Sequence, residues 1–103
     1  MNYRVLAEYF AHNPHEIPTA PLNRRNPLWF YAYAENGVIY VESAKMHSPS
    51  SKISQRRPLN IKEYDTMLDL YHRRKAGEAV SAQAGQMTHN QVYWYGIFKE
   101  LEL

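Results

Sequence analysis

The sequence predicts an α+β domain in which an antiparallel β-hairpin, of two or three strands, packs against a C-terminal set of about three helices. Three observations predict this fold class. Alternating apolar residues flank an Asn-Gly pair, helix-period patterns with capping residues fill the second half, and 103 residues with 45% hydrophobic content suit one small domain. We therefore treat residues 1–103 as a single globular domain with one core.

The first segment, residues 3–11, has two interpretations. As a helix it places Tyr3, Leu6 and Phe10 on one face, and Asn2 precedes it as an N-cap. As a strand it alternates less cleanly, although it would supply the third strand that a marginal two-stranded sheet needs. We prefer the helix.

Residues 12–28 contain four prolines and show no periodicity, which predicts an extended connector on the surface. His12, His15 and Glu16 in this stretch are metal ligands by residue type. The irregular Asn-Pro pair between the two histidines gives no geometry that would bring the three side chains together. We therefore predict no metal site.

The hairpin is predicted over residues 29–44, WFYAYAENGVIYVESA. A two-residue type I′ turn needs positive φ at both central residues, which Asn36 and Gly37 tolerate, and it pairs Tyr33 with Tyr40. The apolar face then comprises Phe30, Ala32, Ala34, Ile39, Val41 and Ser43, and the aromatic face comprises Trp29, Tyr31, Tyr33 and Tyr40, with Glu35 and Glu42 at its rim. A three-residue loop would shift this pairing by one residue.

Residues 45–58 are polar, basic and serine-rich, which predicts a loop that stays mobile unless an anion orders it. A helix over residues 61–76 follows, with Asn60 as N-cap, Glu63 completing a capping box and Gly77 as the left-handed stop. Leu59 and Tyr64 are expected to form a hydrophobic staple. The predicted apolar face of this helix comprises Ile61, Tyr64, Met67, Leu68 and Tyr71.

The last part of the chain predicts two more helices. Residues 78–87 suit one short helix, interrupted at Gly85. Thr88 then begins the final helix, and Gln91 completes a second capping box. Helical spacing predicts that Trp94, Ile97, Phe98 and Leu101 face the core, whereas His89, Tyr93, Gly96 and Lys99 point elsewhere.

Composition excludes several function classes. The chain has no cysteine, so disulfides, thiolate catalysis and sulfur-ligated zinc are excluded. No apolar run is long enough to span a bilayer and the N-terminus lacks a signal-peptide pattern, so we expect a cytoplasmic protein. The sequence contains no nucleotide-binding glycine loop, nucleophile elbow or paired carboxylates in a predictable cleft. We expect no enzyme activity, catalytic residue or cofactor.

The charge is unevenly distributed, although the net charge is only +2. Residues 45–75 contain eight Lys or Arg against three acidic side chains, whereas the remainder has four basic and seven acidic ones. A basic middle on a mildly acidic body favours an anionic partner at that middle. A solvated loop and helix end, with cations at the negative pole of the helix, explains the same pattern without a partner.

Residues 70–98, LYHRRKAGEAVSAQAGQMTHNQVYWYGIF, resemble a helix-turn-helix in outline. A basic helix end, a glycine and a small-residue helix precede a Thr-capped helix with polar residues in its first turn. In that motif His89, Asn90 and Gln91 would contact base edges. The span from Ser81 to Thr88 is about one helical turn shorter than the usual first helix and turn.

We therefore predict a small non-catalytic binding protein that contacts nucleic acid through its basic middle. The expected contact residues are Lys45, His47, Lys52, Arg56, Arg57, Arg73, Arg74, Lys75, His89, Asn90 and Gln91. The alternative is a protein interaction module or homodimer that uses the aromatic face, Trp29, Tyr31, Tyr33 and Tyr40. The acidic rim of that face favours a protein partner over phosphates. If another segment of the same chain covers this face, no ligand is needed to explain its aromatic residues.

Overall fold

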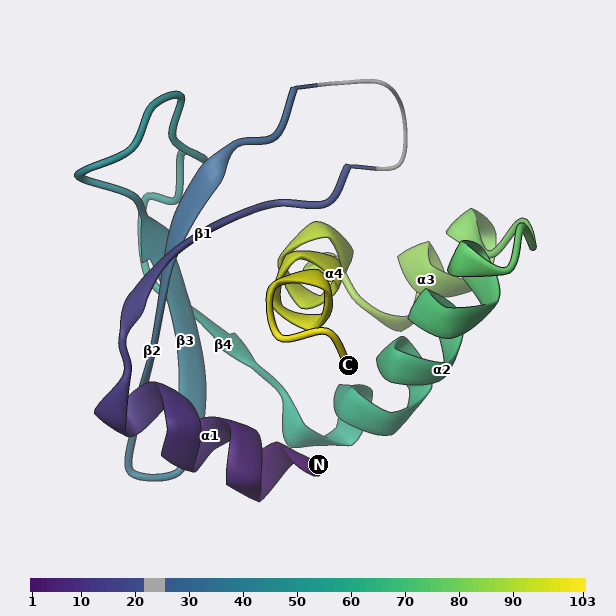
Figure 1. The fold of residues 1–103 in the computed structure, drawn as a ribbon, viewed down its shortest axis with the longest axis horizontal. Helices are drawn as coiled ribbons and strands as arrows, with labels where there is room; N and C mark the ends of the chain where they lie inside the picture. The colour runs from purple at the N-terminus through teal and green to yellow at the C-terminus, as the bar shows by residue number, and fades with distance from the viewer. Residues whose placement is uncertain (22–25) are drawn as a thin grey trace.

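A computed structural model describes residues 1–21 and 26–103 (Figure 1). Residues 22–25, part of the predicted connector, lie outside the described residues. The chain has an α+β fold with a four-stranded antiparallel sheet in the order β1-β2-β3-β4. In chain order the elements are α1 (Tyr3–His12), β1 (His15–Pro18), β2 (Trp29–Glu35), β3 (Val38–Ser43), β4 (Arg57–Leu59), the 3-10 turn η1 (Ile61–Glu63), α2 (Tyr64–Lys75), α3 (Ser81–Met87) and α4 (Gln91–Glu100).

The predicted hairpin and its register are confirmed. Asn36 and Gly37 have φ of 51° and 78°, as a type I′ turn requires, and Tyr33 pairs with Tyr40. Burial alternates along β2 and β3, so the apolar face lies inside and the aromatic face outside. The inner face packs against α1 and α4, and Figure 1 shows no helix on the other side of the sheet.

The prediction of a connector over residues 12–28 is wrong for its first part, because β1 lies there. β1 pairs antiparallel with β2, and its Ile17 side chain is fully buried. Pro18 ends the strand at the sheet edge, where a residue without an N–H group costs no ladder hydrogen bond. β4 likewise occupies the end of the predicted loop and pairs with β3. Both extra strands are three or four residues long, which is too short to show alternation in the sequence.

The helical interpretation of the first segment is confirmed as α1. The Asn2 side chain accepts a hydrogen bond from the Val5 N–H group at 2.9 Å, and the buried side chains include Tyr3, Leu6 and Phe10. The Tyr3 hydroxyl donates to the Leu59 carbonyl and accepts from the Ile39 N–H group at 2.9 Å. One side chain of α1 thus satisfies backbone groups of both β3 and β4.

The helix predicted over residues 61–76 begins as η1 and continues as α2, and Gly77 ends it with a φ of 94°. Asn60 caps the Lys62 N–H group, but Glu63 completes no capping box, because its carboxylate accepts from the Trp94 indole. The predicted apolar face is partly wrong. Ile61 is 52% exposed and Leu68 is only half-buried, while Leu70 lies in the core.

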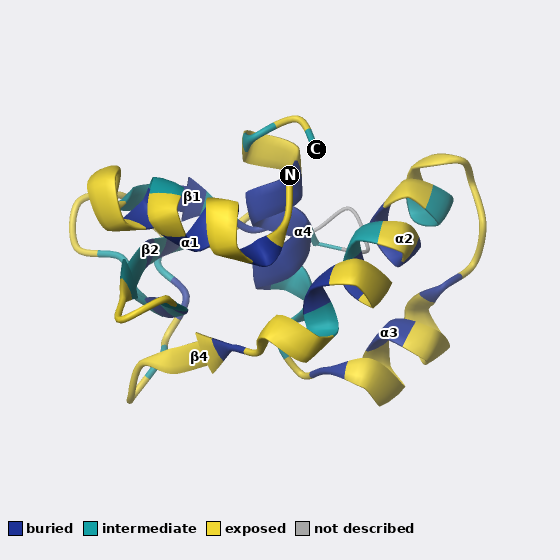
Figure 2. Ribbon diagram, turned by 90° about the horizontal axis from the view of Figure 1, so that it is seen from below, coloured by how far each residue is buried: buried dark blue, intermediate teal, exposed yellow. Residues whose placement is uncertain are grey.

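The last two helices are α3 and α4, and α4 forms the centre of the molecule. Gly85 does not interrupt α3. α4 begins at Gln91 rather than Thr88, because the Thr88 hydroxyl accepts from the Asn90 N–H group and not from the helix. All residues from Tyr93 to Phe98 are buried, so the prediction that Tyr93 and Gly96 point away from the core is wrong. Figure 2 shows this buried helix between the sheet and α2. No helix in the described ranges is long and apolar enough to cross a bilayer.

Candidate nucleic-acid interface

The loop before β4 and the start of α4 meet at one surface. The Arg57 guanidinium donates to the Asn90 side-chain oxygen at 3.3 Å. Beside this contact, the hydroxyls of Ser51 and Tyr93 share a buried hydrogen bond of 2.7 Å. These contacts bring together two sets of predicted residues that are far apart in the sequence. We call the surface around the Arg57–Asn90 contact the loop–helix patch. Lys52, Arg56 and His89 belong to the same two segments, and Arg56 lies over the Tyr40 ring on the aromatic face.

The two segments that form the loop–helix patch lack acidic residues. Neither residues 43–62 nor residues 79–99 contain an Asp or Glu. Lys52, Arg57 and His89 are exposed and form no ion pair with any described residue. Arg56, the neighbouring arginine of Arg57, is instead paired with Glu35 of β2.

The N-terminus of α4 adds to the positive character of this patch. No side chain caps the first turn of α4, and that turn contains no acidic residue. The exposed N–H groups of a helix N-terminus carry the positive pole of the helix dipole. The Asn90 side-chain oxygen accepts a hydrogen bond from Arg57, and the Gln91 side-chain oxygen is buried without a partner among the described residues, so neither amide is free for a bidentate contact with a base. Only His89 of the three predicted base-contacting residues is exposed.

The aromatic face of the hairpin is half-buried and packs against itself. The rings of Tyr31 and Tyr33 are stacked with centroids 5.3 Å apart, and those of Tyr33 and Tyr40 are 5.7 Å apart. The Arg56 guanidinium carbon lies 3.9 Å from the centroid of the Tyr40 ring. The tyrosine rings of this face therefore pack on one another and on Arg56 within the chain.

Arg56 also neutralises part of the acidic rim. It donates to the Glu35 carboxylate at 2.6 Å and to the Tyr33 hydroxyl at 3.3 Å, and these hydrogen bonds raise the pKa of Arg56. Burial raises the pKa of Tyr33. Glu42 forms no ion pair with a described residue, so it remains the uncompensated acid of this face.

Lys45 and His47 lie in a part of the loop that is held in place by hydrogen bonds to Glu16. The Glu16 carboxylate accepts hydrogen bonds from the N–H groups of Lys45, Met46 and His47 and from the His47 ring. Burial alone would raise the pKa of Glu16, but these hydrogen bonds lower it to about 2. The His47 ring stacks on Trp29 with centroids 3.9 Å apart. A carboxylate of β1 thus supplies the anion that this loop segment needs.

The three cations at the end of α2 do not join the loop–helix patch. Arg73 pairs with Asp69 and Glu78, and the hydrogen bond that it donates to Glu78 is the main cause of its raised pKa. Arg74 donates to the backbone carbonyls of Ala20 at 3.5 Å and Pro21 at 2.7 Å. The predicted eleven-residue contact surface is therefore divided between separate places.

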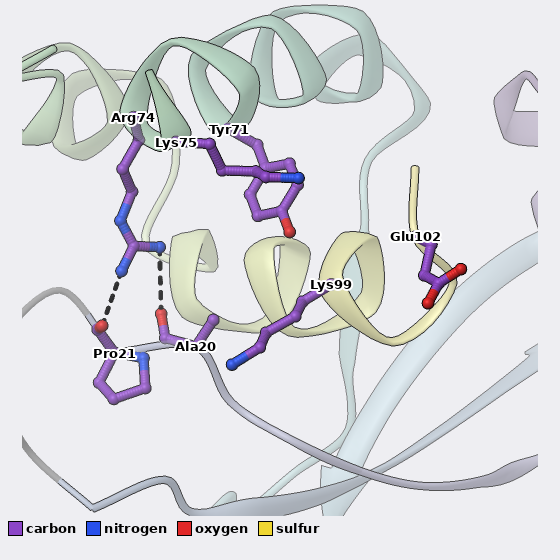
Figure 3. Close-up of a pocket in the computed structure, with 7 residues that line it drawn as sticks. All are labelled: Ala20, Pro21, Tyr71, Arg74, Lys75, Lys99 and Glu102. Atoms are coloured by element: carbon purple, nitrogen blue, oxygen red, sulfur yellow. Dashed lines mark hydrogen bonds between the residues drawn. The ribbon is translucent and has the colours of Figure 1, made fainter. Parts of the chain in front are cut away.

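Arg74 and Lys75 instead line a hollow of about 670 Å³ between α2 and the end of α4 (Figure 3). It lies at the other end of α4 from the loop–helix patch, since Lys99 lines it. The hollow is lined by Ala20, Pro21, Tyr71, Arg74, Lys75, Lys99 and Glu102.

Sequence reasoning missed the roles of Glu16 and Lys99. Glu16 was considered only as a metal ligand, and no group of three His, Asp or Glu side chains within 1–21 and 26–103 is placed to hold a metal. Both roles depend on segments that are far apart in the chain, namely β1 with the loop and α2 with α4. Local spacing contains no signal for such contacts.

Comparison of the chain with known protein families, with curated proteins and with solved structures found no match.

Proposed function

We propose that this domain binds nucleic acid without catalysis, through phosphate contacts made by the loop–helix patch. The observation that supports this most directly is the Arg57–Asn90 contact, which joins an acid-free basic loop to the uncapped positive end of α4. Phosphates are bound by Lys, Arg and helix N-termini in combination. The Arg57–Asn90 contact joins an arginine to a helix N-terminus, and Lys52 belongs to the same basic loop.

The same geometry argues for binding that is independent of sequence. A recognition helix lies in the major groove with its outer face free, whereas α4 is buried from Tyr93 to Phe98. The first-turn amides that could contact adenine are engaged or buried. The proposal is therefore limited to the phosphate backbone.

A second candidate function is self-association through the aromatic face. The observation that favours it is the stack of Tyr31, Tyr33 and Tyr40 on a sheet face that no helix covers. Edges and hydroxyls of tyrosine suit a partly polar protein interface. Because the ring faces already stack on one another, this arrangement is less suited to unpaired bases.

One pair of measurements separates the two functions. Fluorescence anisotropy of a short labelled duplex and a labelled single strand of mixed sequence gives the affinity from about 50 to about 200 mM salt. Three contacted phosphates give a slope of log affinity against log salt of about −2 to −3 for a duplex. Arg57→Gln should weaken binding about tenfold at 50 mM salt and reduce the slope by about 1.

Arg73→Gln is the matched control, because that arginine is paired with two acids away from the patch. It should leave binding unchanged. Binding that is absent at low salt, or that is equally strong in Arg57→Gln, contradicts the proposal. Sedimentation tests the second candidate: Tyr31→Ala with Tyr33→Ala should abolish any dimer and leave nucleic-acid binding intact, and a monomer at every concentration excludes it.

A further inference from the structure

We infer that the hollow between α2 and the end of α4 binds the phosphoryl group of a small organic phosphate. Tyr71, Arg74 and Lys75 reach it from α2, Lys99 from α4, and Ala20 with Pro21 from the segment after β1 (Figure 3). Its volume of about 670 Å³ exceeds a phosphate ion and matches the usual size of small-molecule sites. The apolar walls of Pro21 and Tyr71 would contact the organic part.

The charge of the residues that line the hollow favours an anion. The hollow is lined by three cations against one carboxylate, Glu102. Neither Lys75 nor Lys99 forms an ion pair with a described residue, and the Lys75 ammonium lies 5.3 Å from the centroid of the Tyr71 ring. Each lysine taken alone suits the C-terminal end of its helix. That explanation does not account for their convergence on one cavity.

Tyr71 independently indicates a ligand in the hollow. The residue is only 5% exposed and lines the hollow, and its hydroxyl forms no hydrogen bond to a described residue. In Figure 3 this hydroxyl points from α2 toward α4, with the Lys75 ammonium beside the Tyr71 ring and the Lys99 side chain directed toward Ala20. Burial raises the pKa of Tyr71, so the hydroxyl is protonated and can donate a hydrogen bond to a bound oxygen anion.

The donor set favours phosphate over carboxylate. Arg74 would be the natural partner of a planar carboxylate, but both terminal nitrogens of its guanidinium donate to backbone carbonyls. Arg74 keeps further N–H groups, but these two carbonyls hold its guanidinium at the wall of the hollow. The lining side-chain donors without a hydrogen bond to a described residue are the two ammonium ions and the Tyr71 hydroxyl. Ammonium groups bind as point charges without a planar fork, and a phosphate dianion gains most from two of them.

The test is to titrate the protein with inorganic phosphate, phenyl phosphate or acetate at constant ionic strength and to monitor its amide NMR chemical shifts. Saturable shifts at residues 71, 75 and 99 are expected with both phosphates, with phenyl phosphate binding more tightly and acetate weakly. Lys99→Gln should weaken phosphate binding about tenfold and Tyr71→Phe about threefold. Glu102→Gln should tighten it, because that change removes a like charge.

Lys62→Gln removes an exposed lysine outside the hollow and is the matched control, so it should bind like the unaltered chain. The inference is overturned if no phosphate gives saturable shifts at these amides, if acetate binds as tightly as phosphate, or if Lys99→Gln and Lys62→Gln behave alike. The hollow and the loop–helix patch lie at opposite ends of α4, about 15 Å long, so failure of either proposal leaves the other unaffected.

Discussion

Two buried tyrosine hydroxyls show how the same group can stabilise or weaken this domain. The Tyr3 hydroxyl satisfies a carbonyl of β4 and an N–H group of β3 in the core. The Tyr95 hydroxyl is also buried, but it has no hydrogen-bond partner among the described residues. Burial of a polar group is costly unless it is hydrogen-bonded, so the two should respond oppositely to removal.

Tyr3→Phe is expected to lower the free energy of unfolding by about 1 to 3 kcal/mol, because it leaves the Leu59 carbonyl and the Ile39 N–H group unpaired. Tyr95→Phe removes an unpaired hydroxyl of the same size and should leave stability unchanged or raise it. Urea unfolding measures both. Equal losses in the two variants would show that the Tyr3 hydrogen bonds contribute no specific stability.

Among the helices and strands, the sequence predicts correctly the features that are set by a few neighbouring residues. The Asn36-Gly37 turn, the Asn2 cap of α1 and the Gly77 stop of α2 each depend on a few adjacent residues, and all three are confirmed. β1 and β4 depend on pairing with distant strands, and their short sequences show no period. The faces of α2 and α4 were partly mispredicted because α4 is surrounded by neighbours, so its burial does not follow one stripe.

For the candidate sites too, the sequence predicts what is local and misses what depends on distant contacts. The sequence shows where the basic residues are, but contacts between segments decide which of them remain free to bind a ligand. Arg73 is paired with two acids and Arg74 with two carbonyls, whereas Arg57 and Lys52 stay exposed without an ion pair to a described residue. Such pairing joins segments that are separate in sequence, and composition alone cannot reveal it.

The loop that Glu16 orders gives a prediction about acid. The pKa of Glu16 is about 2 in the folded chain against an ordinary value of 4.5. A lowered folded-state pKa means that its stabilising contribution is complete above pH 4.5 and is lost as the pH falls toward 2. Glu16→Gln should therefore show a flatter decline of unfolding free energy over this range, measured by urea unfolding at several pH values.

Glu8→Gln is the control for that measurement, since the Glu8 side chain is 74% exposed. It should keep the steeper acid dependence of the unaltered chain. If Glu16→Gln and Glu8→Gln decline in parallel with the unaltered chain, the loop contacts of Glu16 do not contribute to stability.

For the whole molecule, α4 connects the core to both proposed sites. Its middle fills the space between the sheet and α2 (Figure 1). Its first turn belongs to the loop–helix patch, and its last turn lines the hollow. The position of α4 against the sheet therefore determines both surfaces. That position depends on a close approach at Gly96, where a Cβ atom would lie 2.7 Å from the Pro18 carbonyl oxygen and 3.2 Å from the Thr19 Cα atom.

Gly96→Ala tests this interlayer contact. The atom nearest to the added methyl group is a backbone carbonyl oxygen, so α4 must move away from β1, and we expect a loss of about 1 to 3 kcal/mol in unfolding free energy. Gly85→Ala in α3 is the matched change, because its Cβ meets nothing within 4 Å, and helix propensity predicts a gain of about 0.5 to 1 kcal/mol. Thermal unfolding of the two variants should shift in opposite directions. A Gly96→Ala chain as stable as the unaltered one would show that α4 is not held against β1 at this point.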